Sequence, residues 1–217
     1  MDTKKKGDIG RLKNSGRTYR PRGEPVGVNV YDFPRLAKGT AVPYRVYDVD
    51  RNRSFVSGGT SNETGEFAAQ SLRWWWRGYG RRWYPKATGW LVCADGREGN
   101  GSNRRGGKYH LWEVTRELGI PVTVCRYPPG TSKWNKVEHR MFFHISMNWR
   151  GVPLESFETV VRRIAGTKTK AGLRVGARLD PMEYGKGEKI SDELMEKVPL
   201  EPHTTHPQWN YTIRPGP

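Results

Sequence analysis

The amino-acid sequence predicts an α/β fold in which helices flank a mixed sheet. Three observations lead to this class: short apolar runs alternate with helical patterns, the first strands follow one another closely, and strand–helix units come later. With 217 residues the chain has room for one domain and extensions, or at most for two small domains, and its nine tryptophans argue against disorder. We expect a core over residues 1–165 and an irregular C-terminal extension over residues 166–217.

The first third of the chain predicts an antiparallel meander followed by a helix. Residues 7–27 are rich in glycine, proline and charge, which predicts an extended loop. Three strands are then expected, at Val28–Phe33, Ala41–Tyr47 and Ser54–Val56. A cap among Ser61, Asn62 and Thr64 begins a helix through Trp76, whose spacing sends at least one tryptophan inward.

Strands and helices alternate in the rest of the core. The expected elements are strand Trp90–Ala94, helix Lys108–Leu118, strand Pro121–Cys125, a long helix capped by Thr131 or Ser132, and helix Leu154–Ala165. The apolar face of the long helix consists of Trp134, Val137, Met141 and Ile145. A short helix at Ser191–Lys197 and an extended tail over residues 203–217 follow. This order is that of an RNase H-like domain, although the pattern alone leaves other α/β arrangements open.

The charge of the chain favours a polyanionic partner. Thirty-eight lysine and arginine residues against 22 aspartate and glutamate residues give a net charge of +16, which favours nucleic acid. No apolar run is long enough to cross a membrane, and no signal-peptide core follows the basic N-terminus. Cys93 and Cys125 lie in apolar runs and are expected to be reduced, buried thiols. We therefore expect a cytoplasmic protein without a membrane partner.

Two basic segments are candidates for contacting DNA. The first contains Lys4, Lys5 and Lys6, and the second contains Arg73 and Arg77 interleaved with tryptophans. Basic side chains among aromatic ones can bind phosphates and stack on bases. The alternative for the second segment is a solvated cationic surface beside ordinary core aromatics.

Three acidic residues are candidates for catalysis. Asp95 follows a buried strand and precedes a glycine-rich loop, and ligands of α/β sheets gather at the carboxyl ends of strands. Many aspartates at such positions merely cap turns. Glu138 lies close to the apolar face of its helix, where a carboxylate needs a cation, either a metal or a basic side chain. The third acid, Asp2, heads the basic N-terminal run.

Seven segments together form a pattern that extends over almost the whole chain. They are Asp2–Lys6 (DTKKK), Val28–Phe33 (VNVYDF), Pro43–Asp48 (PYRVYD), Ala94–Gly96 (ADG), Pro128–His139 (PPGTSKWNKVEH), Ser146–Gly151 (SMNWRG) and Trp209–Ile213 (WNYTI). In these segments the chain resembles the DDE transposases of bacterial insertion sequences, in particular the Rhodopirellula-type (ISAzo-type) family.

The resemblance implies an RNase H-like, integrase-like catalytic core that cuts and joins double-stranded DNA at transposon ends and target. Matched position by position, it implies Asp2, Asp95 and Glu138 as catalytic and metal-binding residues, holding two Mg²⁺ or Mn²⁺ ions. Further DNA contacts are then expected near Glu138, at Lys133, Trp134, Lys136, His139 and Arg140. It also implies a homo-oligomer on DNA, associated with the nucleoid.

Two alternatives to an active transposase remain. In the family the leading aspartate ends an apolar strand, whereas only Met1 precedes Asp2 here, so we expect a truncated first strand and the C-terminal part of a longer transposase. A catalytically inactive remnant that only binds DNA is the first alternative. A stand-alone RNase H-like nuclease is the second, although such an enzyme has no need of the Pro128–His139 block.

Overall fold

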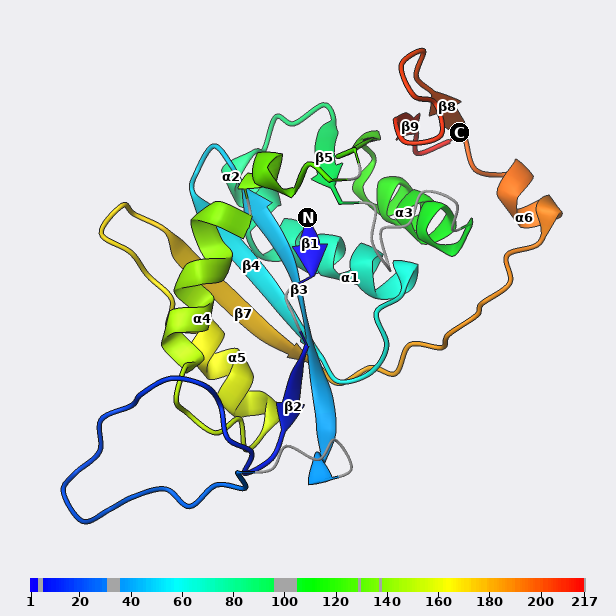
Figure 1. Ribbon diagram of the computed structural model, residues 1–217. Helices are drawn as coiled ribbons and strands as arrows, with labels where there is room; N and C mark the ends of the chain where they lie inside the picture. Colours follow the sequence, from blue (N-terminus) through cyan, green and yellow to red (C-terminus); the bar gives the residue numbers. More distant parts are fainter. Residues whose placement is uncertain (4–5, 31–35, 96–104, 129, 137, 217) are drawn as a thin grey trace. The chain divides into compact units, whose positions relative to one another are not determined.

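The computed structural model describes residues 1–3, 6–30, 36–95, 105–128, 130–136 and 138–216 (Figure 1). For Asp2, Thr3, Ser132, Glu138 and His139 the description covers the backbone alone. The described strands form two mixed sheets accompanied by helices, which confirms the α/β class, although the strands are divided between two sheets instead of forming one. The chain has two compact units: unit 1 comprises residues 1–2, 62–135 and 184–217, and unit 2 comprises residues 3–61 and 136–183.

The first sheet has the strand order β1-β3-β4-β7, with β2 also paired to β3. Its strands are β1 (Asp2–Thr3), β2 (Gly7–Ile9), β3 (Gly39–Asp48), β4 (Arg53–Gly59) and β7 (Arg174–Asp180). β3 is antiparallel to β2 and β4, whereas β4 and β7 are parallel. The β3–β4 hairpin confirms the second and third strands of the expected meander.

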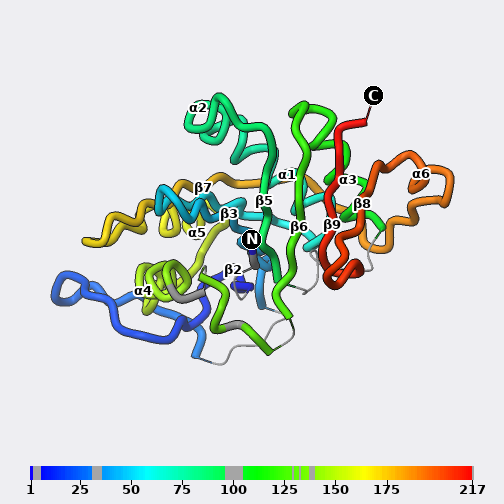
Figure 2. The backbone as a smooth tube through the Cα atoms, turned by 90° about the horizontal axis from the view of Figure 1, so that it is seen from above, coloured from blue at the N-terminus to red at the C-terminus, as the bar shows by residue number. Residues whose placement is uncertain are grey.

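Two helices cover this sheet within unit 2. α4 (Phe143–Trp149) packs against α5 (Phe157–Ala165), and α5 packs against β4 and β7. Figures 1 and 2 show both helices on the same face of the strands. The core between these layers contains Val56, Ile164 and Leu173, each at most 1% exposed. Ser156 caps α5 by accepting a hydrogen bond from the Thr159 amide at 3.2 Å.

The second sheet belongs to unit 1 and has the order β5-β6-β9-β8. Its strands are β5 (Trp90–Ala94), β6 (Val122–Arg126), β8 (Leu200–Pro202) and β9 (Tyr211–Ile213), which Figure 2 shows side by side. β5 and β6 are parallel, and the other pairs are antiparallel. The helices of this unit are α1 (Gly65–Trp75), α2 (Arg81–Trp83), α3 (Arg105–Leu118) and α6 (Asp192–Glu196).

Tryptophan side chains hold the end of α1 to β5. Trp90 stacks on Trp75 at a ring-centroid distance of 5.2 Å and meets Trp76 edge-on at 5.1 Å. Trp75 and Trp76 are 4% and 8% exposed, which confirms that the helix turns tryptophan inward. A π-helical segment (Trp76–Gly80) continues α1, and a Cβ atom at Gly80 would lie 2.5 Å from the Trp76 ring. Thr64 caps α1, because its hydroxyl accepts a hydrogen bond from the Phe67 amide at 3.2 Å. Thr64 is one of the three residues expected as candidates for this cap.

A buried histidine fastens the segment before α6 to α3. Nδ1 of His110 lies 2.8 Å from Oε2 of Glu113, and Nε2 lies 2.7 Å from Oε2 of Glu188. Burial lowers the pKa of His110, but the hydrogen bonds and charges of both carboxylates outweigh it, so the pKa is raised overall.

The N-terminal part differs from the expectation at two places. Residues 7–9 form β2, although residues 7–27 were expected to be a loop. The expected strand at Val28–Phe33 is not found over residues 28–30, where Asn29 forms an isolated bridge with Leu12, and residues 31–33 lie outside the description. Val30 is 64% exposed, so residues 28–30 lack the buried face that stabilises a strand.

The long helix expected from Thr131 is interrupted. The Thr131 hydroxyl donates to the Pro128 carbonyl at 2.6 Å and closes a turn instead of capping a helix. A 3₁₀ turn (Ser132–Trp134) and a π-helical segment (Glu138–Phe142) then precede α4. Met141 and Ile145 are buried as expected, but Trp134 is 56% exposed.

Residues 166–217 are more regular than their polar composition indicates. They contribute β7, β8, β9 and α6, and Tyr211 and Ile213 of the expected tail are buried on β9. α6 confirms the short helix, with Ser191 as its cap. The boundary of the core at residue 165 stays a prediction. In the described part of the chain, no helix has the length and apolar composition to cross a membrane.

Candidate active site

Asp95 stands at the carboxyl edge of the β5–β6 pair. The parallel register places Ala94 opposite Arg126, so that both strands end at the same edge. The Tyr127 amide donates to the Ala94 carbonyl at 3.0 Å and extends the pairing by one step. Val92 and Ala94 are buried while Asp95 is half-buried, because the strand leaves the core at this point. The edge therefore presents a carboxylate where parallel strands of α/β sheets gather ligands.

Two cations flank Tyr211 near the same edge, and the sequence pattern did not single them out. The Arg126 guanidinium donates to the Trp209 carbonyl at 3.3 Å and to the Tyr211 hydroxyl at 3.1 Å. Nζ of Lys108 lies 5.3 Å from the centre of the Tyr211 ring, and so does the Arg126 guanidinium. Burial lowers the pKa of Lys108, and the charge of Arg126 lowers it further.

The backbone next to Asp95 is held by hydrogen bonds, and the cavity behind this edge of the sheet is small. The amino group of Met1 donates to the Cys93 carbonyl. Cys93 and Cys125 are opposite each other in the strand register, and both are free thiols that are half-buried, not fully buried as expected. Burial and the neighbouring Cys93 raise the pKa of Cys125. A cavity of about 30 Å³ behind the edge has room for water but not for a nucleotide.

Glu138 begins the π-helical segment of unit 2. Within this segment Met141 is fully buried, and the guanidinium of the buried Arg45 lies 3.0 Å from the centre of the Phe142 ring. π-helical turns are rare and frequently occur at functional sites. Glu138 and Asp95 belong to different units, and whether their carboxylates meet stays a prediction.

The predicted metal ligands are three carboxylates. Of these, the structure describes the side chain of Asp95. Asp2 lies in β1, but its carboxylate, like that of Glu138, is outside the description. Among the described side chains no group of three or more His, Cys, Asp or Glu could hold a metal ion. The donor set itself is chemically suitable, since carboxylate oxygens are the ligands that Mg²⁺ prefers.

The predicted DNA contacts fall into two kinds. Arg73 and Arg77 are both held by Glu117, each with a nitrogen 2.6 Å from one of its carboxylate oxygens. The remaining described candidates are exposed, as Arg77 is, and no ion pair with Glu117 holds them: Lys6, Lys133, Trp134, Lys136 and Arg140. Lys4, Lys5 and the His139 side chain lie outside the description.

Comparison with known proteins assigns the chain to a family. A family model described as the Rhodopirellula transposase DDE domain matches residues 1–215. No curated protein and no solved structure matches the chain. The family match extends over all seven segments from which the resemblance was inferred and confirms it.

Proposed function

Because the chain belongs to the family of the Rhodopirellula transposase DDE domain, we propose that it is a metal-dependent transposase that cuts and joins DNA at insertion-sequence ends. The observation that carries the proposal is the family match, together with the position of Asp95 at the carboxyl edge of β5 and β6. The mixed α/β architecture is compatible with the proposed RNase H-like core.

We assign Asp2, Asp95 and Glu138 as the ligands of two Mg²⁺ or Mn²⁺ ions. When bound, such ions activate the attacking oxygen and stabilise the leaving oxygen of a phosphoryl transfer. Asp95 offers its carboxylate from a strand end whose backbone is held on both sides, by the Met1 amino group at Cys93 and by Tyr127 at Ala94. A ligand on such a rigid strand keeps its orientation without a further ordering cost.

Double-stranded DNA is the proposed substrate, and exposed basic and aromatic side chains are its proposed contacts. Lys133, Lys136 and Arg140 are exposed cations suited to backbone phosphates, and exposed Trp134 offers a ring for stacking. Lys4–Lys6, His139, Arg73 and Arg77 complete the proposed interface. We also propose a homo-oligomer on DNA, which would hold two transposon ends together, and association with the nucleoid.

The test is cleavage of a labelled duplex that carries the end of the element from the chain's own genomic flanks. With Mg²⁺ or Mn²⁺ the wild type is expected to nick the duplex, and Asp95→Asn and Glu138→Gln are expected to lose at least about a hundredfold in rate. Asp50→Asn, an exposed carboxylate of the β3–β4 turn, is the matched control and should cut normally.

Metal binding gives a readout that does not depend on activity. Calorimetric titration with Mn²⁺ should show binding to the wild type that Asp95→Asn weakens and Asp50→Asn preserves. Normal cutting by the Asp95 and Glu138 variants contradicts the assignment. DNA binding without metal-dependent cutting in the wild type supports the alternative of an inactive DNA-binding remnant.

A further inference from the structure

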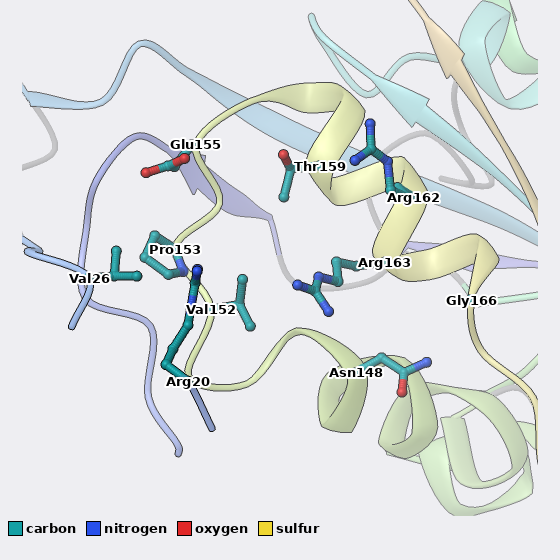
Figure 3. A pocket seen from close by; sticks show the side chains of 10 residues that line it. All are labelled: Arg20, Val26, Asn148, Val152, Pro153, Glu155, Thr159, Arg162, Arg163 and Gly166. Carbon is teal, nitrogen blue, oxygen red and sulfur yellow. The ribbon is translucent and has the colours of Figure 1, made fainter. Parts of the chain in front are cut away.

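Unit 2 contains a cationic pocket that the proposed active site does not use. Its volume is about 400 Å³, and it lies between the N-terminal segment and the α4–α5 region (Figure 3). Three arginines line it: Arg20 from the N-terminal segment, and Arg162 and Arg163 from α5. Asn148 of α4 and Thr159 of α5 also line the pocket. Val152 and Pro153 supply an apolar wall.

Hydrogen bonds fasten the segment that carries Arg20 to the connection between α4 and α5. The Asn14 side-chain amide donates to the Trp149 carbonyl at 2.8 Å and to the Val152 carbonyl at 3.2 Å. In return, the Gly151 amide donates to the Ser15 carbonyl at 3.1 Å. These bonds close the turn after α4 against the segment that leads to Arg20.

Two glycines allow the backbones to approach at this junction. Gly151 has φ +69°, and a Cβ atom there would lie 2.6 Å from the Arg17 carbonyl carbon. Gly16 has φ +123°, and its Cβ atom would lie 2.8 Å from Cβ of Arg150. Distances this short exclude a side chain at either position without a shift of the backbone. This accounts for the last residue of the Ser146–Gly151 segment and makes the pocket wall a fixed feature.

Some charged side chains that line the pocket have an ion-pair partner among the described residues, and others do not. Within the described part of the chain, Arg20 and Arg163 have neither an ion pair nor a hydrogen bond, and both are exposed. Hydrogen bonds from the backbone and from Ser156 lower the pKa of Glu158, and the charge of Arg162 lowers it further. The acid of the lining, Glu155, is paired with Arg11 at 3.2 Å. In the view of Figure 3, Arg20 and Arg163 lie on opposite sides of Val152, with the guanidinium end of Arg163 turned toward Val152 and the end of Arg20 beside Pro153.

We propose that this pocket binds a phosphate of the DNA backbone, with Arg20 and Arg163 as its principal contacts. The planar guanidinium group matches phosphate oxygens in a two-point contact, and two such groups on opposite walls suit one tetrahedral anion. Val152 and Pro153 offer an apolar surface to the adjoining sugar. The inference rests on the proposed function for the identity of the polyanion, and it adds a DNA contact outside the predicted set.

The test compares the salt dependence of DNA binding between two double variants of the full chain. R20Q/R163Q removes two of the three pocket arginines, and K168Q/K170Q removes two exposed lysines of the same unit as a control of equal charge. Binding to a labelled 30-base-pair duplex is measured by anisotropy from 50 to 200 mM NaCl, without divalent metal. Melting curves confirm that both variants fold, as expected for changes at exposed side chains.

Each neutralised phosphate contributes about 0.9 to the slope of log K against log salt, so the pocket variant, which loses one phosphate contact, should lose about 0.9. Over a fourfold rise in salt, the wild type should therefore weaken about 3.5-fold more than the pocket variant. The control should keep its slope within about 0.5. An unchanged slope in the pocket variant, or an equal loss in both variants, overturns the proposal.

Two further experiments complete the test. The first distinguishes a DNA phosphate from a free phosphate ion as the ligand of the pocket, and the second distinguishes failure of this inference from failure of the proposed function. If inorganic phosphate at constant ionic strength stabilises the wild type but not R20Q/R163Q while the slopes agree, the pocket serves a free anion and the DNA proposal is wrong. Asp95→Asn should retain the wild-type slope. If the wild type does not cut the end duplex with Mg²⁺ or Mn²⁺, the proposed function fails while the slope result for the pocket stands. If only the slope result fails, the proposed function stands.

Discussion

Replacing Gly151 with alanine tests how the pocket wall is built. The new methyl group is placed at φ +69° and 2.6 Å from the Arg17 carbonyl carbon, an atom that cannot move without moving the backbone. The left-handed conformation costs about 1–2 kcal/mol for a residue with a Cβ atom. The overpacked contact adds about 1–3 kcal/mol. The free energy of unfolding should therefore fall by about 2–5 kcal/mol, a large part of the 5–15 kcal/mol typical of a domain.

Gly172→Ala is the matched control within the same unit. Gly172 has φ +89°, but nothing lies within 4 Å of its Cβ position, so this variant meets the conformational cost alone. Urea unfolding followed by circular dichroism should give a loss of about 1–2 kcal/mol for Gly172→Ala. The difference between the two variants, about 1–3 kcal/mol, then measures the contact with the Arg17 backbone.

The same pair of variants connects the junction to the pocket. Because the junction holds the segment that carries Arg20, Gly151→Ala should also reduce the salt slope of DNA binding, and Gly172→Ala should leave it unchanged. Equal losses of unfolding free energy in both variants would refute the close approach of the two backbones. A normal slope in a destabilised Gly151→Ala would refute its role in placing Arg20.

Three further outcomes are expected in unit 1. His110→Gln should be less stable than the wild type below about pH 6.5, because the raised pKa of His110 keeps the histidine charged there. The difference in unfolding free energy should disappear as the pH rises through that pKa, and urea titrations from pH 5.5 to 9 measure it. Trp90→Ala should lose about 2–3 kcal/mol in unfolding free energy because it removes the ring contacts with Trp75 and Trp76, and Trp90→Phe should lose less. Glu117→Gln should change the unfolding free energy by less than about 1 kcal/mol, since its ion pairs are partly exposed, and anisotropy at low salt should show tighter DNA binding if the two released arginines contact DNA.

Elements with local signals could be predicted from the sequence. The strand Trp90–Ala94 is found with the expected bounds, because a short apolar run ends at a turn. Thr64 and Ser191 cap their helices, because a hydroxyl before a helical pattern satisfies free amides wherever the helix packs. These features depend on residues within one turn of each other.

Elements that depend on distant partners could not be predicted. β2 is a strand because residues 7–9 pair with residues 39–41, and nothing in its glycine-containing sequence indicates a strand. β9 likewise forms because residues 211–213 pair with β6 and bury Tyr211 and Ile213. For β7 the alternation of Val175, Ala177 and Leu179 was an available signal.

The same distinction applies to the sites. Asp95 was found because a strand end and a glycine-rich loop are adjacent in sequence. Arg126 was missed, although the parallel pairing of two predicted strands would have placed it at the same edge. The pocket of unit 2 brings Arg20 to Arg163 through the contact of two glycine-containing turns, which no local pattern indicates.

The ion pairs of Arg73 and Arg77 with Glu117 indicate where nucleic-acid contacts should be sought first. To bind a phosphate, Arg73 and Arg77 must leave the Glu117 carboxylate, and exchanging one anion for another gains little free energy. An exposed cation with no ion pair within the described residues, such as Lys133, has no such exchange to make and releases a counterion from the DNA. In the arginine–tryptophan segment, which by composition is the most suggestive of nucleic-acid binding, Trp75 and Trp76 are buried, and Arg73 and Arg77 are already paired with Glu117. Exposed cations in less conspicuous segments are expected to contribute more to the salt dependence of DNA binding.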